Sequence, residues 1–323
     1  MANLPPDSAA AAFGRPLLTT PGELSLTNYV RKAGRAVLFL LTATSVLAVF
    51  LIFFFIIREA WPFIAKYGLD EMFGSTGWYP EADQAEFGAL AIFAGSLYVT
   101  GGALLIAGPL GLLTAAFLSD IVPFQARQII KPVVELLAAI PSVAYGFFAI
   151  LVFAPFLQEH LGMATGANAL NAAILLAIMA LPTIVSVAED AMMAVGKDLR
   201  AASYALGATR AETVVKTIIP AAHNGIIAAV ILGIMRAIGE TMVVWMASGN
   251  ASQIPSPWWD LREPVRTMTA TIAGDMGETV KGSDHYRALF TIGLLLLVFT
   301  FILNLITEYF LHRVAKRAGG MKL

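Results

Sequence analysis

Long apolar runs separated by short polar segments dominate the chain. Six runs, at residues 35–57, 87–117, 129–156, 168–190, 222–248 and 287–311, are long enough to cross a bilayer as helices, which takes about 20 residues each. Glycines and prolines inside the second and third runs are tolerated where neighbouring helices satisfy the freed backbone groups. The pattern predicts an all-α polytopic membrane protein with six transmembrane helices.

The composition supports a membrane protein and removes several kinds of chemistry. Of the 323 residues, 58% are hydrophobic and only 13% are charged, whereas a soluble domain averages about 25% charged residues. The chain has no cysteine, which excludes disulfides, thiolate metal ligands and cysteine nucleophiles. The four histidines are scattered without a ligand-like spacing, so no metal site is expected.

Basic residues predict the orientation of the helices. With both tails and the loops 118–128 and 191–221 on one side, that side carries thirteen Lys and Arg residues and the other carries six, Arg58, Lys66, Arg262, Arg266, Lys281 and Arg287. The positive-inside rule then places both termini in the cytosol. The outer loops carry aromatic residues typical of interfacial segments, Trp78, Tyr79, Trp258 and Trp259. The expected organisation is a cytosolic tail (1–30), a first helix with its outer loop (31–83), the main transmembrane domain (84–311) and a second cytosolic tail (312–323).

The cytosolic loop 197–221 reads KDLRAASYALGATRAETVVKTIIPA. Its spacing predicts a short helix, a turn at Gly207, and a second short helix that ends near Pro220. Thr209 and Glu212 have the spacing of a capping box, in which each side chain bonds the backbone N–H of the other residue. Two interpretations stay open, an interfacial helix pair that lies on its own bundle and a docking element for a cytosolic partner.

Two charges lie inside the fifth apolar run, at Arg236 and Glu240. A charged side chain near the bilayer centre costs about 2.5–3.5 kcal/mol on insertion scales. On a continuous helix, residues four apart share a face, so the two side chains are expected to meet. One interpretation is a structural ion pair between helices. The other is a water-lined path in which the planar guanidinium of Arg236 binds an oxyanion while Glu240 keeps that binding weak.

Four further residues are weaker candidates for such a path. Glu135 lies near the cytosolic end of the third run, where a snorkelling carboxylate is equally consistent. Pro141 and Ser142 are expected to interrupt the same run near mid-membrane, and interrupted helices often line transport paths; the remaining candidates are Tyr145 and Thr241. The glycine-rich run VTGGALLIAGPLG indicates close helix packing. No GxxxxGK[ST] motif is present, so the chain is expected to be a non-enzymatic component without its own ATPase.

The stretch AASYALGATRAETVVKTIIP resembles the EAA loop of binding-protein-dependent ABC importer permeases. Gly207 and Pro220 have the expected spacing, whereas Ala201 stands at the glutamate position and Thr217 at an isoleucine position. In that family the loop inserts into a groove of the ATPase subunit. The resemblance implies ATPase contacts for seven residues: Ala201, Ala202, Ser203, Gly207, Thr209, Arg210 and Glu212.

Three longer segments, residues 131–147, 236–250 and 264–304, resemble the permease subunits of phosphate importers. The resemblance implies a type I importer permease fold in a bacterial inner membrane, with Arg236 and Glu240 critical for transport. It also implies a PstA-like second permease, a dimeric PstB-like ATPase that uses ATP and Mg, and a PstS-like phosphate-binding protein, periplasmic or lipid-anchored. Membrane lipids, but no cofactor and no nucleic acid, are expected at this chain. The alternatives are a sulfate or molybdate importer, an ion-coupled secondary transporter, and a non-transporting scaffold or sensor.

Overall fold

The computed structural model describes residues 21–318, with side chains described for residues 31–310. The chain divides into two compact units, residues 1–55 and 56–323. Helix α2 (Pro21–Tyr67) provides the described part of the first unit and continues into the second. Most of the expected N-terminal tail, residues 1–20, lies outside the described residues, as do residues 319–323.

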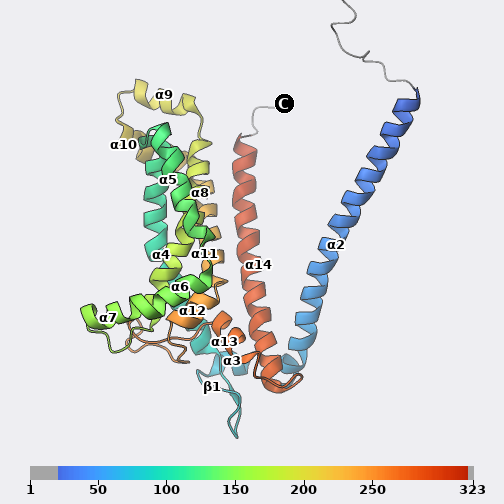
Figure 1. Cartoon of the computed structure of the whole chain (residues 1–323), viewed down its shortest axis with the longest axis vertical. Coiled ribbons are helices and arrows are strands. Elements are labelled where there is room, and N and C mark those ends of the chain that lie inside the picture. Colours follow the sequence, from blue (N-terminus) through green and yellow to red (C-terminus); the bar gives the residue numbers. More distant parts are fainter. Residues whose placement is uncertain (1–20, 319–323) are drawn as a thin grey trace, which may run out of the picture. The chain divides into compact units, whose positions relative to one another are not determined.

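Three long helices form the centre of the second unit: α4 (Leu90–Ala116), α8 (Ala169–Met193) and α11 (Ile219–Ile238). Helix α8 packs against both α4 and α11, and α14 (Asp284–Ala318) packs against α11 (Figure 1). Six helical segments among the described residues are long and apolar enough to cross a membrane. The number of spans is therefore confirmed, although two of them begin or end elsewhere than the pattern predicted.

Small residues let the central helices approach one another. A Cβ atom added to Gly102 would lie 2.9 Å from the Cβ of Ala173, and one added to Gly111 would lie 2.7 Å from Ile184. Gly233 on α11 meets the same Ile184 from the other side. In membrane helix pairs, close packing of this kind replaces the hydrophobic drive that water provides. The predicted packing role of the glycine-rich run is confirmed.

The third predicted span is not one helix. Helix α5 (Phe124–Ala139) ends before Pro141, and α6 (Ser142–Phe148) starts directly after it. Ile140 is extended, with ψ at 127°, because the ring of the following proline disfavours helical backbone there. The segment long enough to cross the membrane is Ser142–Leu161; it continues from α6 through the π-helical turn η2 (Ala149–Phe153) into α7 (Ala154–Leu161). The predicted interruption is confirmed, and the predicted boundaries 129–156 are wrong.

The fifth span also differs from the prediction. The helix does not end near Pro220: α10 (Arg210–Thr213) passes through the π-helical turn η3 (Val214–Ile218) directly into α11. Pro220 lies directly after this π-helical turn; a proline has no N–H for the preceding turn, so a local change in the helical hydrogen-bond pattern is expected there. At its other end the helix stops at Ile238, and α12 (Met242–Ala247) starts after a break at residues 239–241.

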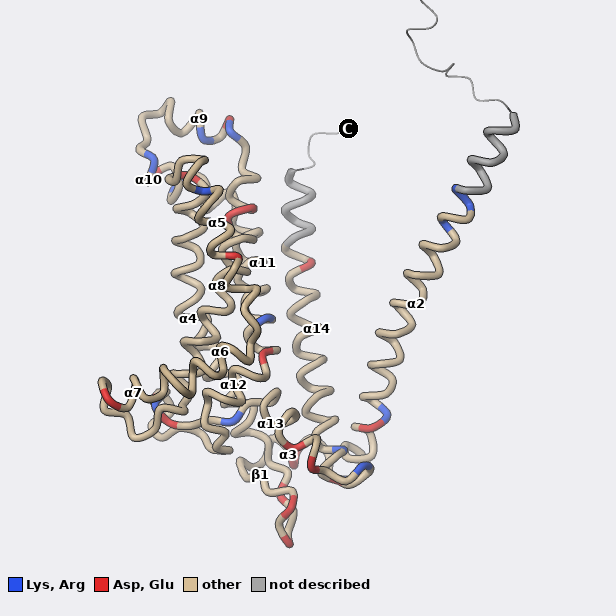
Figure 2. The backbone as a smooth tube through the Cα atoms, viewed as in Figure 1, with Lys and Arg blue, Asp and Glu red and all other residues tan. Residues whose placement is uncertain are grey.

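Short elements gather at the two ends of the bundle. Helix α9 (Lys197–Ala205) and α10 lie at one end, called here the hairpin end (Figure 1). The opposite end, called here the loop end, carries α3 (Asp70–Gly74), the strands β1 (Trp78–Tyr79) and β2 (Glu86–Phe87), and α13 (Met268–Asp275). The strands pair antiparallel, with Trp78 opposite Phe87. In the second unit, charged residues concentrate at these two ends, with few along the middle of the helices (Figure 2).

Candidate functional site

The break between α11 and α12 separates the two charges of the fifth span. Arg236 lies in the last turn of α11, whereas Glu240 lies in the break itself. Thr241, the residue before α12, has φ −111° and ψ −57°. The i, i+4 geometry of a continuous helix is therefore lost. Among the described residues no ion pair includes Arg236 or Glu240, so the expected pairing is wrong.

Arg236 is exposed in this single chain and has weak polar contacts. Its Nε donates one long hydrogen bond, 3.4 Å, to the carbonyl of Met179 on α8. Its charge also interacts with Tyr145 of α6, whose hydroxyl donates to the carbonyl of Leu137 at 2.9 Å. The structure thus brings two of the predicted residues together, Arg236 and Tyr145. Within the described residues, the other N–H groups of the guanidinium donate no hydrogen bond and could bind another partner.

Glu240 is held through its backbone. The hydroxyl of Thr269 donates to the Glu240 carbonyl at 2.8 Å, which satisfies a group that the helix break sets free. Beside Glu240 lies a cavity of about 10 Å³, lined by the hydroxyl-bearing residues Ser96, Thr100, Thr267 and Thr269 and by apolar side chains. That space is close to the minimum that can hold one water molecule. Glu240 is half-buried and lies next to polar groups that the sequence pattern did not reveal.

Glu135, Ser142 and Thr241 do not join this arrangement. Glu135 is exposed on α5 and accepts a hydrogen bond of 3.2 Å from Ser186 of α8. Ser142 is half-buried at the start of α6, directly after the predicted proline break. Within the described residues, no hydrogen bond or ion pair links any of these three side chains to Arg236.

A buried carboxylate lies between α5 and α8 and was not predicted from the sequence. Glu189 has no exposed side-chain surface; Arg127 Nε lies 2.5 Å from one of its oxygens and Lys131 Nζ lies 3.0 Å from the other. Lys131 also reaches Asp190 at 3.1 Å. Arg127, Lys131 and Glu135 are four residues apart on α5, a spacing that gives them one face of that helix. This spacing in the sequence indicates a charged face on α5, but it does not show that Glu189 of α8 is the residue that this face contacts.

The hairpin end has the predicted local geometry. The hydroxyl of Thr209 accepts from the Glu212 N–H at 3.3 Å, and the Glu212 carboxylate accepts from the Thr209 N–H at 3.0 Å, so the capping box is confirmed. Gly207 makes the turn with φ +82°, a backbone conformation that favours glycine. Ala201, Ala202 and Arg210 are exposed. A cleft of about 300 Å³ lies along the hairpin, lined in part by Ser203, Gly207 and Glu212.

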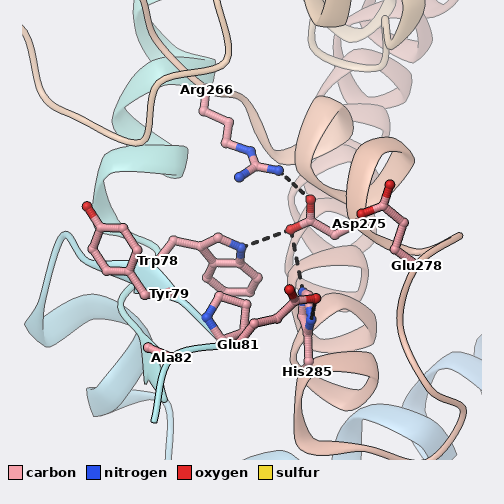
Figure 3. A pocket seen from close by; sticks show the side chains of 9 residues that line it. Trp78, Tyr79, Glu81, Ala82, Arg266, Asp275, Glu278 and His285 are labelled. Atoms are coloured by element: carbon pink, nitrogen blue, oxygen red, sulfur yellow. Dashed lines mark hydrogen bonds and ion pairs between the residues drawn. The ribbon is translucent and has the colours of Figure 1, made fainter. Parts of the chain in front are cut away.

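Polar groups at the loop end converge on Asp275 (Figure 3). Its carboxylate accepts from Trp78 Nε1 at 3.0 Å and pairs with Arg266, and His285 Nε2 lies 3.5 Å away. Burial alone would raise the pKa of Asp275, but its contacts with His285, Trp78 and Arg266 together lower that pKa below its usual range. Trp78 is 4% exposed, so it is a core residue and not the interfacial side chain that the sequence predicted.

A neighbouring cavity of about 290 Å³ opens beside this cluster, with Tyr79 and Glu81 on its lining. His285 Nδ1 lies 3.9 Å from the Glu81 carboxylate. Within the described part of the chain, no group of three or more His, Asp or Glu side chains is placed to hold a metal ion. The contacts of Asp275 with Trp78 and His285 connect β1 with α13 and α14.

The chain matches a known family of membrane transport proteins. Residues 107–316 match the family described as "Binding-protein-dependent transport system inner membrane component". The chain belongs to this family of ABC importer permeases. It is therefore a multi-pass membrane component of a transporter, and the family implies three kinds of partner: an ATPase, a substrate-binding protein and a second permease.

Individual relatives share most of their length with this chain. It is 40% identical over 243 residues to the probable ABC transporter permease protein YqgH of Bacillus subtilis, covering 75% of this chain and 78% of that protein. It is 36% identical over 280 residues to the phosphate transport system permease protein PstC of Mesorhizobium japonicum, covering 81% and 84%. The PstC protein of Haemophilus influenzae is 32% identical over 279 residues, covering 80% and 86%.

A solved structure supports the fold. An inward-facing form of the MetNI methionine ABC transporter matches with a TM-score of 0.50 and 20% sequence identity, over 68% of this chain and 91% of the other. The type I importer permease fold expected from the sequence is thereby confirmed.

Proposed function

We propose that this chain is a permease subunit of an ATP-driven importer of inorganic phosphate and forms half of the translocation pathway. The observation that carries the proposal is Arg236: an exposed guanidinium inside a membrane-spanning helix, without a carboxylate partner among the described residues. The names of the PstC relatives support phosphate as the transported ion.

The chemistry of Arg236 fits a transient oxyanion site. Its donors form a planar fork that matches two oxygens of a tetrahedral anion and stays charged at physiological pH. The face that carries it is exposed in the isolated chain, so the second permease would complete the path at a pseudo-two-fold interface. Tyr145, which interacts electrostatically with Arg236, would help to orient the anion.

Glu240 would contact the transported phosphate and would not act as a permanent counter-ion of Arg236. Since the helix break holds it away from Arg236, the guanidinium is free for the anion in this state. A protonated phosphate oxygen could donate a hydrogen bond to the Glu240 carboxylate, whereas sulfate at neutral pH has no proton to donate. Glu135, Ser142 and Thr241 would then contribute to the lining of the path outside this centre.

The assembly would follow the orientation that the basic residues predict. The hairpin end and both termini would face the cytoplasm of a bacterial cell, with the chain in the inner membrane, and the loop end would face a periplasmic or lipid-anchored phosphate-binding protein. A dimeric PstB-like ATPase, which uses ATP and Mg, would dock on the exposed hairpin residues Ala201, Ala202, Ser203, Gly207, Thr209, Arg210 and Glu212. A PstA-like permease would supply the other half of the path.

Uptake by a strain that lacks its own phosphate importers tests the proposal. The chain, expressed with its partners, should restore uptake of labelled phosphate, and excess sulfate should not compete. Restored uptake of sulfate or molybdate alone would contradict the proposal. Phosphate uptake that persists without the ATPase and collapses with an uncoupler would indicate an ion-coupled secondary transporter instead.

A further inference from the structure

Arg200 joins the hairpin to two other helices. It lies on α9, and its Nε donates to Asp120 Oδ1 at 2.7 Å. Asp120 belongs to the π-helical turn η1 (Phe117–Ile121) that follows α4. The other guanidinium nitrogens donate to the carbonyls of Met192, at 2.8 Å, and of Val195, at the end of α8. One side chain therefore connects α9 with the ends of α4 and α8.

This connection is partly buried and strongly polar. The Arg200 side chain is 16% exposed and that of Asp120 is 4% exposed. Ser119 donates a second hydrogen bond to the Asp120 carboxylate at 2.6 Å. Charge-assisted bonds of this kind are the strong ones in proteins, and the flat fork of arginine fixes their direction. A lysine could not contact the carboxylate and both carbonyls with one rigid group.

Helix α9 has little else to hold it in place. None of its residues is buried. Its other described side-chain bonds come from Ser203 and reach the second arm of the hairpin, which begins at α10: the Ser203 hydroxyl lies 2.9 Å from that of Thr213 and accepts from Thr217 at 3.4 Å. The first arm of the hairpin, α9, is thus tied to the ends of α4 and α8 by one guanidinium and to the second arm by one hydroxyl.

The second arm of the hairpin is continuous with the helix that carries Arg236. The backbone stays helical from Arg210 to Ile238. At 1.5 Å per residue, the 26 steps from Arg210 to Arg236 span about 39 Å. A displacement of the hairpin therefore has a direct mechanical route to Arg236.

We propose that Arg200 is a positioning residue that transmits motion. It holds the first arm of the hairpin against α4 and α8, so that a movement imposed at the hairpin shifts the second arm, and with it α11 and Arg236. The inference rests on the proposed docking of an ATPase at the hairpin. The contact between Arg200 and Asp120, called here the Arg200–Asp120 joint, then couples ATP hydrolysis to the transport site.

The test uses the full complex and a reporter that does not depend on the transported ion. The chain has no cysteine, so a single Met235→Cys substitution, beside Arg236, gives a clean site for thiol labelling. The rate of labelling should change when ATP is added to the complex with Arg200 intact. With Arg200→Gln, the complex should still hydrolyse ATP, but the ATP-dependent change in labelling rate should shrink about tenfold.

Two further variants make the result decisive. Asp120→Asn cuts the same joint from the other side and should reproduce the effect. Arg58→Gln is the control, because Arg58 is exposed and belongs to no ion pair in the described residues; it should leave the labelling response intact.

Each remaining outcome overturns the inference or separates it from the proposed substrate. An unchanged response in Arg200→Gln, or no ATP-dependent response with Arg200 intact, would exclude transmission through the joint. Loss of the ATPase from both the Arg200→Gln and the Asp120→Asn complexes would reduce the joint to a structural support. A Met235→Cys complex whose labelling responds to ATP through Arg200, yet which imports no phosphate, would contradict the proposed substrate and leave the joint supported.

Discussion

Two groups of charges in the bundle are built in opposite ways. Between α5 and α8, the fully buried Glu189 is contacted by Arg127 and Lys131. At the end of α11, the contacts of Arg236 within the described residues are one long hydrogen bond to a carbonyl and an electrostatic interaction with Tyr145, although a glutamate lies four residues away. In the first group, each charge has an oppositely charged neighbour within the bundle. The second leaves a guanidinium available, as an anion site requires.

The difference has a physical basis in desolvation. A buried charge that loses its partner is strongly destabilising, because neither water nor a counter-ion replaces the partner. An exposed guanidinium keeps access to water or to a ligand, so it does not need a permanent carboxylate. Substitutions in the first group should therefore change stability, and substitutions in the second should change transport.

The largest effect is expected at Glu189. Glu189→Gln removes the carboxylate from between two cations and should lower the free energy of unfolding by about 3 kcal/mol. The measurement is the thermal midpoint of the purified complex, followed by size-exclusion chromatography after heating. Asp190→Asn is the matched control: it touches the same Lys131, but its side chain is 70% exposed, so little shift is expected. Equal shifts for the two variants would show that Glu189 is not the centre of the cluster.

Arg236→Gln should lower phosphate uptake and leave the stability of the complex nearly unchanged. Loss of charge-assisted bonds to the anion, worth about 1.5–3 kcal/mol, should lower phosphate uptake about 10- to 100-fold. The thermal midpoint should stay near that of the unmodified complex, because no buried carboxylate loses its partner. Arg236→Lys should give intermediate uptake, since it keeps the charge but not the planar fork. A midpoint that falls as far as that of Glu189→Gln would make Arg236 a structural residue.

The comparison also shows which features can be predicted from sequence. The break at Ile140–Pro141 was predictable because a proline acts on its direct neighbour. The break at residues 239–241 contains no proline, and the Thr269 hydroxyl that supports it lies 29 residues further along the chain. Without that contact, a continuous helix and an Arg236–Glu240 pair were the reasonable expectation.

Local and distant contacts differ in the same way elsewhere. The capping box of Thr209 and Glu212 involves residues three apart and was predicted correctly. The partners of Glu189 lie about sixty residues earlier in the chain, and those of Asp275 come from β1, α14 and the segment before α13. A pattern along one helix shows that charges share a face, but it does not show which charge of another helix faces them.

Asp275 lies between the two extremes and should give the smallest effect. It is paired like Glu189, but its side chain is 18% exposed and one of its donors is the neutral Trp78. Because its pKa is lower in the folded chain than in the unfolded one, the ionised carboxylate stabilises the fold above the unfolded value of about 3.9. That contribution is lost as the pH falls through the folded pKa.

We expect this loss to lower the free energy of unfolding by about 1 kcal/mol. It should be measured as a lower thermal midpoint at roughly pH 3 than at roughly pH 5. Asp275→Asn should lower the midpoint at pH 7 and flatten this acid-side drop. A variant that keeps the full drop would show that other carboxylates cause it, and that the loop end is held chiefly by the apolar contacts of Trp78 and Phe87.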